Sequence, residues 1–338
     1  MTPDNRIIES VPNFSEGRNK EVIDAIARAI ASVEGVKLLH VDMGYAAHRT
    51  VITFAGPPQA VVEGAFQGAK TAGQLIDMRL HHGTHPRIGA TDVLPLVPIK
   101  GITLEECAKL AQDLARRMAH EEGIPCYCYE AAALRPAFRN LAVCRAGEYE
   151  ALPQKLAQPE LQPDIMPDDL SRVPQVGCSV VGARPYLIAV NFNLNTKDVR
   201  LAKAIAAQVR QKGSDGRPDA LKTVKAIGWY IDEYGIAQVS TNLTDISVTP
   251  LHTAFEAVSR QAQAHGLQVT GTEIIGLVPK QVLIEAGHHF MGSTEAAAST
   301  SDDEAIRTAV QAMHLDDLRP FHPQEKVIEY VLERQSQL

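Results

Sequence analysis

The sequence predicts an α/β (α+β) protein made of two ferredoxin-like split βαβ subdomains, and three observations support this fold class. Short apolar runs of strand length alternate with stretches of helical apolar spacing, which is typical of mixed α/β chains. The elements of the first half follow the order βαββαβ, and the second half repeats that order. The chain of 338 residues is also longer than one hydrophobic core usually supports, so a duplicated domain is expected.

In the first half the elements can be assigned in turn. Asn19 is placed to cap the first helix, Pro58 lies near the start of the second, and Thr103-Leu-Glu-Glu106 has the pattern of a capping box. The predicted strands are 6–11, 36–42, 49–55, 93–99 and 125–129, and the predicted helices are 21–33, 58–76 and 103–122.

The second half shows the same order with different spacing. Thr196 is the expected cap of its first helix. The predicted strands are 186–192, 224–231, 237–242 and 268–277, and the helices are 196–211, 251–265 and 304–313. Segment 158–177, with four prolines, and segment 287–303, which is small and polar, are expected to be irregular. We place the subdomain boundary between residues 180 and 181, giving subdomains 1–180 and 181–338.

Composition excludes several classes of partner. The chain has 33 Lys+Arg against 40 Asp+Glu, a formal charge of -7, and no basic stripe of the kind that a nucleic acid backbone requires. No apolar segment approaches the roughly 20 residues that cross a bilayer, and no leader pattern opens the chain. The five cysteines are odd in number and are expected to be reduced thiols. These features indicate a cytoplasmic protein with neither nucleic acid nor membrane partners.

The stretch HHGTHPRIGATD, residues 81–92, has the most chemical content. His81 and His85 are four residues apart, but Gly83 and Pro86 prevent the helix on which that spacing would hold a metal, and no HExxH pattern is present. No metal site is therefore predicted. A histidine that is neutral near physiological pH can accept and return a proton, so we expect a catalytic histidine in this loop. The alternative is that its histidines are solvated loop residues.

Two neighbouring stretches are candidate contributors to the same site. Asp42, His48 and Arg49 lie at strand ends of the same split βαβ unit, and an acid there would orient a catalytic imidazole. Either Asp42 or Asp92 could serve, and the alternative is a set of ordinary turn residues. The junction that begins at Asn13 joins a strand to a helix, where short polar side chains often contact ligands. The alternative is that this junction is only the approach to the helix capped by Asn19.

Six stretches together resemble one family. They are VPNFSEG, DMGYAAHRTVITFAGPP, LIDMRLHHGTHPRIGATDVLPLVPI, GIPCYCYE, AGEYEAL and IGWYIDEYGIAQVSTNLTD. In order and spacing they are similar to glutamate formimidoyltransferase, also called formiminotransferase, from about Ile7 to about Tyr330.

The resemblance implies a fold, a reaction and a set of residues. The family has two α/β subdomains with a folate groove between them, usually forms homodimers, and transfers the formimino group of N-formimino-L-glutamate to tetrahydrofolate. Its catalytic histidine precedes Pro-Arg and corresponds to His85. The segment before Gly177, which includes Asp168 and Pro174, would contact folate. Because the chain ends at Leu338, the cyclodeaminase activity of bifunctional relatives is not expected.

From this follows a predicted mechanism. His85 would move a proton from the attacking N5 amine to the leaving glutamate amine, with Asp42 as a possible orienting acid. Arg49, Arg87 and Arg184 are the candidates for binding substrate carboxylates. Tetrahydrofolate would be a co-substrate, with no metal or tightly held cofactor, and His81 and His82 receive no role. The alternatives are a related enzyme that uses N-formylglutamate or 5-formyltetrahydrofolate, a non-catalytic folate-binding protein, and a metal-dependent hydrolase.

Overall fold

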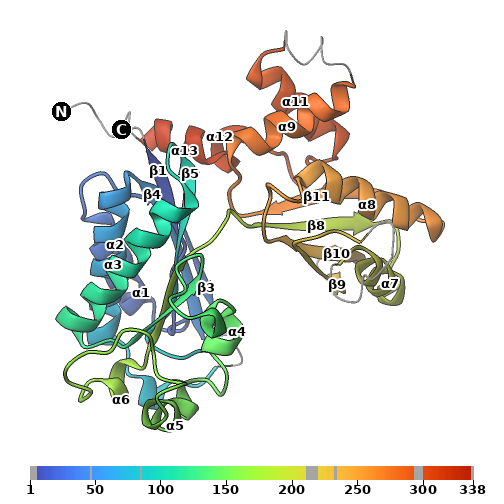
Figure 1. Ribbon diagram of the computed structural model, residues 1–338. Helices are drawn as coiled ribbons and strands as arrows, with labels where there is room; N and C mark the ends of the chain where they lie inside the picture. The colour runs from blue at the N-terminus through green and yellow to red at the C-terminus, as the bar shows by residue number, and fades with distance from the viewer. Residues whose placement is uncertain are drawn as a thin grey trace. The chain divides into compact units, whose positions relative to one another are not determined.

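The computed structural model describes residues 6–45, 48–83, 86–210, 220–231, 234–292 and 300–335. It divides into two compact units, Met1–Arg184, coloured from blue to yellow-green in Figure 1, and Pro185–Leu338, coloured from yellow-green to red. The predicted boundary at 180/181 falls inside strand β7 (Ser179–Ala183). Because β7 is hydrogen-bonded into the sheet of the first unit, the division lies after Arg184 instead.

The first unit confirms the βαββαβ order, with its first strand interrupted at Val11-Pro12. Proline has no N–H to donate to a strand ladder, and the chain pairs with β4 and β5 on both sides of the break. The elements are β1 (Ile7–Ser10), β2 (Asn13–Phe14), α1 (Lys20–Ala31), β3 (Lys37–Gly44), β4 (Arg49–Gly56), α2 (Pro58–Leu75) and β5 (Thr91–Lys100).

The sheet has the strand order of a ferredoxin-like unit. The interrupted first strand lies between β4 and β5, and β3 pairs with the outer side of β4, all antiparallel. Beyond β5 the sheet continues with two parallel strands, β7 and then β6 (Cys126–Glu130). Helix α3 (Leu104–Glu122) connects β5 to β6, so β7 is inserted between two strands that precede it in the chain.

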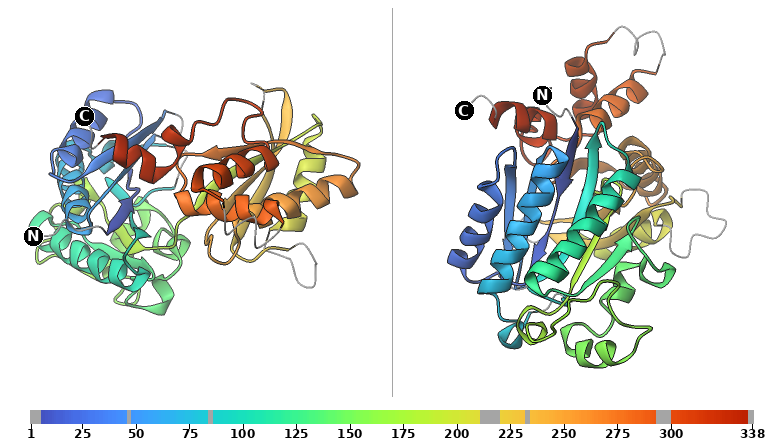
Figure 2. Two further views of the ribbon diagram at one scale, coloured as in Figure 1. Left: turned by 90° about the horizontal axis from the view of Figure 1, so that it is seen from above. Right: turned by 60° about the vertical axis from the view of Figure 1, so that its left-hand side comes forward.

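Helices α1, α2 and α3 cover one face of this sheet (Figure 2, right). Their apolar sides and the strands form the larger buried cluster, which includes Ile26, Phe66 and Leu114. The caps predicted for these helices are confirmed. Asn19 accepts the backbone N–H groups of Glu21 and Val22, and the Thr103 capping box makes both of its hydrogen bonds.

A smaller buried cluster lies around β5, β6 and β7 and includes Val93, Tyr127, Val180 and Val173. Three short helices contribute to it: α4 (Leu141–Cys144), α5 (Leu152–Ala157) and α6 (Val173–Val176). All five cysteines are buried and free of disulfide bonds, as expected.

The second unit repeats the frame with strand order β11-β8-β10-β9, all antiparallel. The ferredoxin-like duplication is therefore confirmed. Its elements are β8 (Ile188–Leu194), α7 (Val199–Val209), β9 (Val224–Ile231), β10 (Ile236–Leu243), α8 (Leu251–Ala264) and β11 (Val269–Ile275), followed by α9 (Lys280–Met291), α11 (Asp302–Ala312), α12 (Pro323–Lys326) and α13 (Ile328–Gln335).

Three local predictions are wrong in whole or in part. Segment 158–177 is irregular, as expected, up to residue 172, but residues 173–176 form α6, and the unpredicted strand β7 follows. Residues Gly287 to Met291 belong to α9, because Gly287 allows α9 to pack directly against α11; a Cβ there would lie 2.0 Å from the carbonyl oxygen of Ala305. The cap of α7 is Asp198, whose carboxylate accepts the N–H of Arg200, while Thr196 accepts the N–H of Asp198 one step earlier.

Candidate functional site

Loop 81–92 is held against the strand-to-helix junction of VPNFSEG. The Ser15 N–H donates to the carbonyl of Ala90 at 2.9 Å, and the Ser15 hydroxyl donates to the carbonyl of Gly89 at 2.7 Å. Gly17 approaches the β3–β4 hairpin so closely that a Cβ would lie 2.4 Å from the carbonyl oxygen of Gly44. Glycine is needed there because any side chain would push the two segments apart.

Glu16 organises the start of α1. One of its carboxylate oxygens, Oε1, accepts the backbone N–H groups of Gly17, Arg18 and Asn19 at 2.7–2.9 Å. Partial burial raises the pKa of Glu16, but these backbone donors together with His48 outweigh it and lower the pKa below its usual value. Glu16 is therefore a stable carboxylate at the edge of the site.

Two histidines of the site are stacked. The ring centroids of His48 and His81 are 4.2 Å apart and the planes differ by 14°. His48 contacts the carbonyl of His82 through Nδ1 at 2.9 Å and Glu16 through Nε2 at 3.1 Å. His81 contacts the carbonyl of His48 through Nε2 at 2.7 Å and the guanidinium of Arg87 through Nδ1 at 3.2 Å. All four ring nitrogens therefore have a partner.

The environment of His81 keeps its imidazole neutral. Only 4% of the residue is exposed, and burial, with smaller contributions from His48 and Arg87, lowers the pKa of His81 below its ordinary value. The interpretation of His81 as a solvated loop residue is wrong, because the loop folds it inward between the hairpin and Arg87.

Arg87 uses every N–H of its guanidinium, a group with five donors. Nε donates to His81 Nδ1, Nη1 to Glu148 and Glu150, and Nη2 to Glu150 and the His81 carbonyl. Glu150, then Glu148, raises the pKa of Arg87. The prediction that Arg87 binds a substrate carboxylate is not favoured by this geometry, because two carboxylates of the AGEYEAL stretch already occupy it.

Asp92 anchors the far end of the loop. It is fully buried, accepts the N–H of Ile88 at 3.0 Å and pairs with the guanidinium of Arg145. Burial raises the pKa of Asp92, and Arg145 and Arg49 oppose that rise. Burial lowers the pKa of Arg49 to about 10, so Arg49 remains a cation at neutral pH. The role of Asp92 as the acid that orients a histidine is not favoured, because its oxygens face Arg145 and Ile88.

The segment predicted to contact folate adjoins the same loop. Gly177 and Gly89 form an isolated antiparallel bridge, and a Cβ on Gly177 would lie 2.3 Å from the carbonyl oxygen of Ile88. Pro174 is exposed, and its carbonyl accepts the Tyr149 hydroxyl at 2.5 Å. Gly177 is thus in direct contact with the loop, and Pro174 is linked to it through Tyr149, whose N–H donates to the carbonyl of Arg87 at 3.0 Å.

The remaining predicted residues have mixed positions. His85 lies outside the described residues, so its pairing with Asp42 is not observed; Asp42 itself is exposed on β3.

Asn13 is buried on β2, where its Nδ2 donates to the carbonyl of Val11 while Oδ1 has no partner among the described residues. Arg184 follows β7 and lowers the pKa of Tyr129, which burial raises to about 12. Asp168 is exposed.

Several residues of the site have no role in the sequence-based prediction. His48 had only a possible place near the loop, His81 had no role, and the carboxylates of Glu148 and Glu150 were not considered as partners of Arg87. The available signal is the AGEYEAL stretch itself, in which two acids, Glu148 and Glu150, flank Tyr149 within one of the stretches that carry the resemblance.

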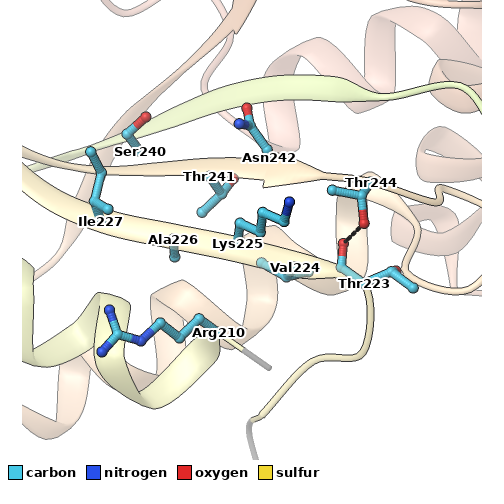
Figure 3. Close-up of a pocket in the computed structure, with 10 residues that line it drawn as sticks. All are labelled: Arg210, Thr223, Val224, Lys225, Ala226, Ile227, Ser240, Thr241, Asn242 and Thr244. Atoms are coloured by element: carbon cyan, nitrogen blue, oxygen red, sulfur yellow. Dashed lines mark hydrogen bonds between the residues drawn. The ribbon is translucent and has the colours of Figure 1, made fainter. Parts of the chain in front are cut away.

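Two pockets differ in chemical character. One, about 390 Å³, lies beside the loop and is lined by His82, Gly83, Arg87, Gly147, Glu148 and Glu150. The other, about 630 Å³, runs along the edge strand β9, with Lys225 on one side and Arg210 on the other (Figure 3). Within the described residues that line the β9 pocket there is no histidine or carboxylate, so the loop pocket is the better candidate for proton transfer.

No group of three or more His, Cys, Asp or Glu side chains among the described residues is arranged to hold a metal ion. None of the described helices is long and apolar enough to cross a membrane.

The duplicated fold and this loop define a class: a two-unit α/β protein with imidazole, carboxylate and guanidinium groups gathered at one loop, a combination suited to acid–base chemistry. Within that class, the chain belongs to the formiminotransferase family. Residues 7–184 match the N-terminal subdomain of the formiminotransferase domain, and residues 189–333 match the formiminotransferase domain model that follows it.

Relatives of two lengths are similar to the chain. Formimidoyltransferase-cyclodeaminase of Sus scrofa is 48% identical over 97% of this chain, which spans 60% of that protein. Glutamate formimidoyltransferase of Streptococcus pyogenes is 41% identical over 85% of this chain and 93% of its own length. The Thermoplasma acidophilum protein of the same name is 41% identical over 84% of this chain and 92% of its own length.

Proposed function

We propose that this protein transfers the formimino group of N-formimino-L-glutamate to N5 of tetrahydrofolate, giving 5-formiminotetrahydrofolate and L-glutamate. Family membership across both units supports the reaction class. Two relatives of similar length carry the name glutamate formimidoyltransferase. Tetrahydrofolate acts as a co-substrate. We also expect a cytoplasmic homodimer, and light scattering on the purified protein would test whether it is a dimer.

The chemistry needs one proton to move between two amines. N5 attacks the amidine carbon and becomes positively charged, while the glutamate nitrogen leaves only after it gains a proton. His85 is the proposed shuttle, since a neutral imidazole can accept the first proton and return it to the second, an effect of ~10²–10⁴ in rate. Asp42 is the proposed orienting acid. Asn13, Arg49, Arg184, Asp168, Pro174 and Gly177 are the proposed substrate contacts.

The observation that carries the proposal is the charge of the loop pocket. Arg87 contributes one positive charge and Glu148 and Glu150 contribute two negative charges, leaving an excess of one carboxylate. The Glu148 and Glu150 side chains are 40% and 60% exposed, so both reach solvent in the pocket. A formimino group is an amidine, which is protonated at neutral pH and planar like a guanidinium, whereas a formyl amide is neutral. Excess carboxylate therefore favours the formimino donor over the formyl donor.

The decisive experiment compares donors. Wild type and His85→Ala are assayed with N-formimino-L-glutamate and N-formylglutamate against tetrahydrofolate, with His120→Gln, an exposed histidine on α3, as the matched control. We expect transfer from the formimino donor by wild type and the control, and a loss of at least ~10²-fold in His85→Ala. Transfer from the formyl donor only would favour a related one-carbon enzyme. Folate binding without transfer from either donor would instead favour a non-catalytic folate-binding protein.

A further inference from the structure

The side chains of His81 and Arg87 join the two ends of the stretch that contains the proposed shuttle His85. Arg87 Nε donates to His81 Nδ1 at 3.2 Å, and Arg87 Nη2 donates to the His81 carbonyl at 3.2 Å. The two residues are 4% and 6% exposed. The stretch from 81 to 87 is therefore closed at its base by side-chain contacts that exclude water.

The partners of His81 determine where its proton lies. A guanidinium N–H can only donate, so Nδ1 must present its lone pair to Arg87, and the single ring proton must be on Nε2, where it is donated to the carbonyl of His48 at 2.7 Å. A second proton on Nδ1 would break the contact with Arg87 and place two cations side by side. The lowered pKa of His81 agrees with this geometry.

The groups on either side of His81 are themselves fixed. Arg87 is bound by Glu148 and Glu150 through charge-assisted contacts of 2.6–2.9 Å. The flat face of His81 stacks on His48, which is tied to the carbonyl of His82. The ring therefore links the β3–β4 hairpin to the stretch 148–150, with the loop between them.

We propose that His81 is a positioning residue: a neutral imidazole, protonated on Nε2, that joins the two described ends of loop 81–87 and on which the rate of the proposed proton transfer therefore depends. This inference rests on the proposed function. The proposal gives His81 and His85 different roles. The basic nitrogen of His81, Nδ1, already accepts a hydrogen bond from the Arg87 cation, so His81 cannot also accept the proton that the shuttle carries. A displacement of about 1 Å in a catalytic group can cost ~10²-fold in rate, which sets the expected effect.

The test compares His81→Leu, which removes both hydrogen bonds, with His81→Gln, whose amide keeps one donor and one acceptor. Neither side chain titrates. We expect kcat to fall about 100-fold in His81→Leu and about 10-fold or less in His81→Gln, with KM for both substrates changed by no more than about 3-fold. The inflection of the pH–rate profile should stay at its wild-type position in both variants, and His120→Gln serves again as the control.

Three results would overturn the inference. If His81→Gln is as inactive as His81→Leu and the pH inflection disappears, His81 is itself the shuttle. If both variants keep wild-type kcat, the base contacts do not position the catalytic group. If His81→Leu fails to fold, the ¹⁵N chemical shifts of the imidazoles in wild type, assigned with His81→Gln, decide: the inference requires a neutral Nε2–H tautomer for His81, and an imidazolium at neutral pH contradicts it. Absence of formimino transfer in wild type would refute the proposed function separately and leave this tautomer test in force.

Discussion

Among the described residues, each unit of this protein has a stacked pair of histidines, and the two pairs differ in what faces the ring nitrogens. In the first unit, His48 and His81 are 4.2 Å apart and all four nitrogens are bonded. In the second unit, His252 on α8 and His289 on α9 are 4.3 Å apart with planes at 19°. There Nε2 of His289 contacts Glu256 at 2.8 Å, while the buried Nδ1 of His252 has no partner among the described residues.

The difference shows that stacking of imidazoles does not by itself indicate a role. The first pair is enclosed by charged groups that select one protonation state for His81, and it lies in loops that bring distant segments together. The second pair packs between two helices, with His289 and Glu256 about 40% exposed. We therefore expect changes around the first pair to affect both activity and stability, and changes around the second to affect stability alone.

The largest effect is expected at Asp92, which is fully buried beside the first pair's loop. Asp92→Asn keeps an oxygen for the Ile88 N–H but removes the charge that Arg145, only 14% exposed, requires. Leaving a buried guanidinium without its carboxylate should reduce the free energy of unfolding by about 3–5 kcal/mol. Urea unfolding measures the effect, and an unchanged midpoint would mean that Arg145 finds another partner or water.

An intermediate effect is expected when one charged residue beside each histidine pair is replaced: Arg87 beside the first pair and Glu256 beside the second. Arg87→Met should lower kcat at least ~10²-fold, because the loop base opens, and should reduce the free energy of unfolding by about 1–3 kcal/mol, because the exposed carboxylates of Glu148 and Glu150 can be resolvated. Its counterpart, Glu256→Gln, removes an exposed contact to His289.

The Glu256→Gln substitution should change the free energy of unfolding by less than ~1 kcal/mol and leave kcat unaltered. Equal losses of kcat in Arg87→Met and Glu256→Gln would contradict the distinction between the pairs.

The smallest effect is the pH dependence of stability. Burial, followed by the charge of His289, lowers the pKa of His252, against the opposite influence of Glu256 and Glu285. The unfolded chain therefore takes up a proton near the ordinary value of 6.5 while the folded protein does not. The contribution of neutral His252 to the free energy of unfolding is therefore fully present above that pH. It is lost as the pH falls toward the pKa of His252 in the folded protein.

His252→Gln should make unfolding midpoints less dependent on pH in this range without changing kcat, as followed by urea titrations at several pH values. His81→Gln should reduce the same dependence and change kcat as well, because the pKa of His81 is lowered too. If His252→Gln leaves the pH dependence unaltered, the buried Nδ1 has a partner such as water in solution.

Much of the fold could be predicted because its signals are local. The βαββαβ order follows from runs of apolar residues with strand or helix spacing, and the caps at Asn19 and Thr103 depend on residues two or three positions away. Strand β7 was missed because its short, Gly-containing sequence has no distinctive periodicity. Its place between β5 and β6 depends on pairing with residues far away in the chain.

The sequence by itself determined the duplicated frame, the family, and the fact that loop 81–92 cannot be a helix, since Gly83 and Pro86 act on the backbone where they stand. Only the tertiary structure decided that His81 is buried and neutral and that Arg87 is saturated by Glu148 and Glu150, 61 and 63 residues later. A histidine's role depends on the donors, acceptors and charges around its two nitrogens. Those groups come from separate segments, so their meeting is settled by chain packing rather than by any local pattern.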